Sequence, residues 1–180
     1  MTKFKDYNQT INTLKQIGVN HKQIQNVNSG DIWEIDLEKN TLFPLMFINP
    51  VNAVFGEKTT VMNFQIFVMD LVYTVQQQDR SATATSQNQD QIQEQTVLSD
   101  CLQICQDIIS TFKTGEALYH SNIGINEDAA YFIEEGDITI EPFTERFDNA
   151  AVGWVFTIPV LLMNDYQTCN IPSTTDYAGK

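Results

Sequence analysis

The apolar segment VGWVFTIPVLLM, residues 152–163, limits more than any other feature how this chain can fold. Thr157 and Pro159 interrupt it, and it is well short of the ~20 residues that a membrane-spanning helix needs. As a β-strand it presents apolar side chains on both faces, because successive side chains point to opposite sides. Helices can cover one of these faces, and we expect a neighbouring copy of the chain to cover the other.

Two segments have the hydrophobic spacing of amphipathic helices. In residues 6–18 apolar side chains recur at every third or fourth position, and Gly18 is expected to cap the end of the helix. Residues 92–113 place large apolar side chains on one broad face, and Gly115 is expected to end this second helix.

Residues 22–75 change to the two-residue period of β-strands and predict three or four of them. The turn-forming residues 28–31 are expected to join the first two strands as a hairpin, and residues 56–58 precede the long strand TTVMNFQIFVMDLVY. Pro44 and Pro50 break the segment between them. Two more strands are expected in AAYFIEEGDITIEPF and AVGWVFTIPVLLM.

Residues 76–91, QQQDRSATATSQNQDQ, contain no large apolar side chain. Such a segment cannot offset the entropy of folding with a core of its own. We therefore predict an extended polar arm, which either orders against a partner or forms a solvated loop.

These elements predict one α+β domain that spans residues 1–180. Strands that follow one another pair as hairpins, so the sheet is expected to be mostly antiparallel, with both helices packed on one face. The long polar arm lies between a strand and the second helix.

The net charge of −13 and the pI near 4.3 leave no basic surface for gripping phosphates. Sequence-specific binding to nucleic acid is therefore not expected, although an acidic wall can line a channel through which DNA slides without sticking. The first residues, MTKFKDYNQT, contain no apolar signal region, and we expect the protein to be made and assembled in a cytoplasm. Three cysteines argue against a disulfide framework.

No pattern of residues predicts catalysis, and we expect neither an enzyme nor a cofactor. Cys101 and Cys105 have the spacing of two metal ligands on a helix, but they coincide with its apolar face and are expected to pack in the core. His120 precedes Ser121 without a nucleophile elbow, and there is no glycine-rich phosphate loop. The acidic residues 134–137 lack the spacing of a calcium loop.

A polar group flanked by phenylalanines precedes the last strand. Its arginine can bind a carboxylate with two parallel hydrogen bonds, either as an internal lock at the entry of the strand or as a contact between subunits. We favour the internal lock. The lock residues are Phe143, Glu145, Arg146, Phe147 and Asp148.

The segments FQIFVMDLV, VLSDCLQICQDIISTF and ITIEPFTERFDNAAVGWVFTIPVLL, followed by YQTCNIP, resemble virion proteins of tailed bacteriophages. In neck, tail-completion or tail-terminator-like proteins a PFTERFD…GW segment leads into the last strand, and an ending similar to Cys169-Asn170-Ile171-Pro172 closes the domain. The resemblance covers about residues 60–172. It implies a tail-terminator-like domain that assembles as a ring around the DNA channel.

The resemblance implies a structural virion protein, located at the phage neck or tail top, that joins the portal or adaptor to the tail. The expected partners are further copies of the chain, in a ring of about six or twelve, and other neck, portal or tail proteins. DNA passes through without specific binding, and no membrane is involved. The alternative is a small ligand-binding or adaptor protein with one non-identical partner. The predicted interface residues are Gln77, Arg80, Thr83, Gln87, Trp154, Phe156 and Leu161.

Overall fold

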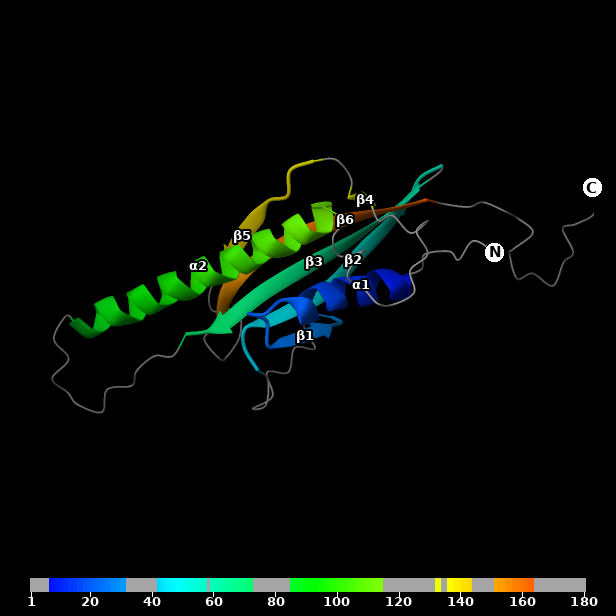
Figure 1. Cartoon of the computed structure of the whole chain (residues 1–180). Helices are drawn as coiled ribbons and strands as arrows, with labels where there is room; N and C mark the ends of the chain where they lie inside the picture. Colours follow the sequence, from blue (N-terminus) through cyan, green and yellow to red (C-terminus); the bar gives the residue numbers. More distant parts are fainter. Residues whose placement is uncertain are drawn as a thin grey trace, which may run out of the picture.

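A computed structural model describes residues 7–31, 42–57, 59–72, 85–114, 132–133, 136–143 and 151–163 (Figure 1). Within these ranges two helices and six strands confirm the α+β class. In chain order the elements are α1 (Tyr7–Asn20), β1 (Asn26–Ser29), β2 (Leu45–Phe55), β3 (Thr59–Leu71), α2 (Thr85–Thr114), β4 (Phe132–Ile133), β5 (Ile140–Phe143) and β6 (Ala151–Met163).

The strands form one sheet in the order β1-β2-β3-β6-β4, and β5 also pairs with β6. β3 and β6 pair antiparallel along their whole length, from Thr59 opposite Met163 to Leu71 opposite Ala151. β2 pairs antiparallel with β3, and the connection follows Phe55, where the sequence predicts a turn. The most apolar segment of the chain therefore lies inside the sheet, where both of its edges have partners.

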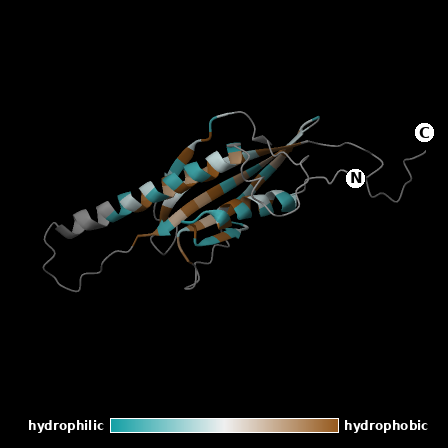
Figure 2. Cartoon of the chain, in the orientation of Figure 1, coloured by the Kyte–Doolittle hydropathy of each residue, from teal (hydrophilic) through white to brown (hydrophobic). Residues whose placement is uncertain are grey.

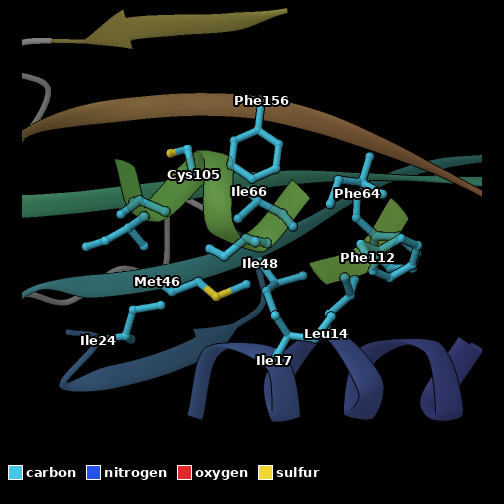
Figure 3. Packing of buried hydrophobic residues seen from close by; sticks show 14 of the residues in the cluster. Leu14, Ile17, Ile24, Met46, Ile48, Phe64, Ile66, Cys105, Phe112 and Phe156 are labelled. Carbon is cyan, nitrogen blue, oxygen red and sulfur yellow. The ribbon is translucent and has the colours of Figure 1, made fainter. Parts of the chain in front are cut away.

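Both helices cover the same face of this sheet (Figure 1). The long strands carry mostly apolar residues, whereas the helices alternate between apolar and polar ones (Figure 2). Leu14 and Ile17 of α1 point toward Ile48 of β2 in the core (Figure 3). The even-numbered residues of β6 face this layer, and Phe156 is only 2% exposed.

The second face of the sheet has a smaller apolar cluster at one end. It joins residues from four strands: Leu45, Phe47, Phe67, Met69, Phe143, Ala151 and Val155. The rings of Phe67 and Phe143 pack edge to face with their centroids 5.8 Å apart. The chain itself therefore buries this end of β6, and no neighbouring copy is needed there.

Gly18 does not end α1, which continues to Asn20. A Cβ at Gly18 would lie 2.5 Å from the Met46 Sδ and 2.8 Å from the Val27 Cγ2. The glycine is thus explained by the close approach of the helix to the sheet and not by a cap.

β1 pairs parallel with β2, with Asn26 opposite Leu45, and the hairpin predicted after β1 stays a prediction. The second strand of that hairpin, residues 32–37, lies outside the described residues. Pro50 is inside β2, not at its end, and it comes two residues after Ile48, the last residue that pairs with β1. A proline is tolerated there because its missing N–H faces an edge without a ladder bond.

The predicted polar arm is partly helical. α2 begins at Thr85, so residues 85–91 are its first turns, and they extend beyond the end of the sheet (Figure 1). Residues 76–84 lie outside the described residues. Within the part of the chain that the structure describes, no helix is long and apolar enough to cross a membrane.

Candidate interaction surface

The two described cysteines belong to the core, as predicted. Cys101 and Cys105 are free thiols buried between α2 and the sheet. Burial, helped by the negative charges of Asp70 and Asp100, raises the pKa of Cys101 to about 12. Burial also raises the pKa of Cys105. Neither thiol is available as a thiolate at neutral pH, so they pack as small apolar side chains.

His21 joins the two helices. Its Nδ1 accepts a hydrogen bond from the Gln23 N–H at 3.3 Å, and its Nε2 lies 3.4 Å from the Asp107 Oδ2 in α2. An imidazole with its proton on Nε2 satisfies both contacts. No group of three or more metal-ligating side chains occurs among the described residues, and His120, Ser121 and residues 134–135 lie outside them.

Among the described residues, the most exposed apolar surface is the tip of the β2–β3 hairpin, Val51–Glu57, where seven consecutive residues are exposed. We call it the hairpin tip. Val51, Val54 and Phe55 have 53%, 55% and 75% of their surface exposed. The tip projects past the helix layer (Figure 1). Isolated exposed apolar residues are ordinary, but three within five residues on a projecting hairpin are typical of a contact surface.

Among the described strands, none pairs with the outer edge of β2 along the hairpin tip. β1 pairs only with Leu45–Ile48, and no described strand pairs with this edge beyond Ile48. Natural proteins usually protect such edges with charges, lysine above all. Here no charged residue occurs from Leu42 to Phe55, in β6, or in β3 before Asp70. In a chain of net charge −13, the sheet is thus a nearly neutral surface.

Between the apolar cluster and the hairpin tip, the second face of the sheet carries amide side chains. The Asn63 Nδ2 donates to the Asn52 Oδ1 at 2.6 Å, and the Asn49 Nδ2 donates to the Gln65 Oε1 at 3.5 Å. A shallow hollow of about 470 Å³ lies beside them, between residues 136–139 and β6. Its lining mixes amides with apolar side chains and holds two carboxylates, Asp137 and Glu141.

The structure separates the predicted interface residues of β6. Trp154 is half-buried, and its Nε1–H donates to the Leu98 carbonyl oxygen of α2 at 2.7 Å. Phe156 is in the core beneath the helices. Leu161 is half-buried on the opposite face and pairs with Val61 of β3. Of these three side chains, only Leu161 lies on the face that the helices leave open.

The other predicted residues are only partly described. Gln77, Arg80 and Thr83 lie outside the described residues, and for Gln87 the structure gives the helical backbone alone. Of the predicted lock, Phe143 is buried in the cluster on the second face. Glu145, Arg146, Phe147 and Asp148 lie outside the described residues, so the lock stays a prediction.

The hairpin tip was not among the residues that the sequence pattern pointed to. The signal was nevertheless present, because the apolar residues of VNAVF come directly before the turn at Gly56 and after Pro50, without a charge between them. Val54 and Phe55, at the far end of the hairpin, lie beyond the end of the helix layer, so neither α1 nor α2 covers them.

No protein-family model matches this chain, and no curated protein matches it significantly.

Proposed function

We propose that this protein is a structural virion protein that assembles into a homomeric ring at the neck or tail top of a tailed bacteriophage. The ring joins the portal or adaptor to the tail around the DNA channel. The resemblance of the PFTERFD…GW segment to tail-terminator-like proteins supports the phage assignment. The exposed apolar hairpin tip supports assembly of several copies.

The single observation that carries the proposal is the exposed apolar side chains of Val51, Val54 and Phe55 in the hairpin tip, with no charged residue before Glu57, on a chain of net charge −13. Copies with this charge repel one another, and contact through neutral surface avoids adding to that repulsion. Burying a large apolar side chain completely contributes roughly 1.5–3 kcal/mol. Val51, Val54 and Phe55, each at least half exposed, thus offer on the order of 3–5 kcal/mol to each contact.

The acidic excess also suits a channel for DNA. An acidic lumen does not hold the phosphate backbone, so DNA passes without specific binding. Interfaces in permanent rings typically bury more than about 2,000 Å². The hairpin tip is then one part of a larger contact, to which the amide-bearing second face can add hydrogen bonds.

Native mass spectrometry and negative-stain electron microscopy of the purified protein test this proposal. We expect ring-shaped particles for the wild type and a loss of at least tenfold in self-association for Phe55→Asp. Val19→Asp is the matched control, because Val19 is 63% exposed but lies on α1, away from the sheet. A wild type that stays monomeric at high concentration and is missing from the particles of its phage would overturn the proposal.

A further inference from the structure

We draw no further inference here: the strongest candidate, the shallow hollow between residues 136–139 and β6, carries two carboxylates, Asp137 and Glu141, but no second feature in the described part of the chain points to a ligand there.

Discussion

Trp154 offers a measurement that distinguishes a role within the chain from one between chains. Replacing it by phenylalanine removes the Nε1–H that donates to the Leu98 carbonyl at 2.7 Å. A hydrogen bond of this kind contributes about 1 kcal/mol net, and the smaller ring gives up about 1 kcal/mol of apolar burial against the core. We therefore expect the free energy of unfolding to fall by about 2 kcal/mol.

The assay is urea unfolding followed by far-ultraviolet circular dichroism, which does not depend on the tryptophan that is removed. In thermal melts, 2 kcal/mol corresponds to a decrease of about 4–8 °C for a chain of this size. Thr157→Val is the matched control: Thr157 is exposed on the same strand, and its replacement should change stability by less than about 0.5 kcal/mol. If Trp154→Phe leaves unfolding unchanged but weakens assembly, Trp154 belongs to a subunit interface and the argument is refuted.

Three further predictions concern the interior. Gly153→Ala should cost about 2 kcal/mol or more in urea unfolding, because a Cβ there would run into the Val68 carbonyl oxygen of the neighbouring strand; an unchanged midpoint would contradict this. Burial, opposed by a hydrogen bond from a backbone N–H and reinforced by Asp100, raises the pKa of Asp70 above its ordinary 3.8. The ionised carboxylate therefore destabilises the fold at neutral pH, and stability recovers as the pH falls through the raised pKa. Asp70→Asn should be more stable than the wild type at pH 7 and should lose this pH dependence, which unfolding at pH 7 and pH 4 checks. Cys101 should react with a thiol reagent only after unfolding, as mapped by peptide mass spectrometry; rapid labelling of the native protein would contradict its burial.

The long strands and both helices could be predicted because their periodicity is local. β3 and β6 carry apolar residues on both faces with few polar interruptions, which is typical of strands inside a sheet. The start of α2 could not be predicted in the same way. Its first turns extend past the sheet, so their sequence carries no apolar stripe to reveal the helix.

Other features depend on neighbours that are distant in sequence. The parallel pairing of β1 with β2 could not be predicted from the turn residues after β1, which are also suited to a hairpin. Gly18 has the position of a cap, and only the approach of Met46 and Val27 explains it.

The candidate site escaped prediction for a related reason. The β-forming residues before Pro50 indicate a strand, but they do not show where the helices above it end. The first four residues of β2 are buried and Val51 to Phe55 are exposed, although both stretches contain large apolar side chains. The position of the helix layer decides the difference.

The bulge in β2 between Pro50 and Asn52 limits how the hairpin can change length. The one additional residue there sets which side chains beyond it face each side, and it places Asn52 opposite Asn63. Adding or deleting a single further residue would turn Val54 and Phe55 to the wrong sides, whereas a pair added across both strands would only extend the reach. A hairpin of this kind can therefore be lengthened in evolution only by insertions of matching length in both strands.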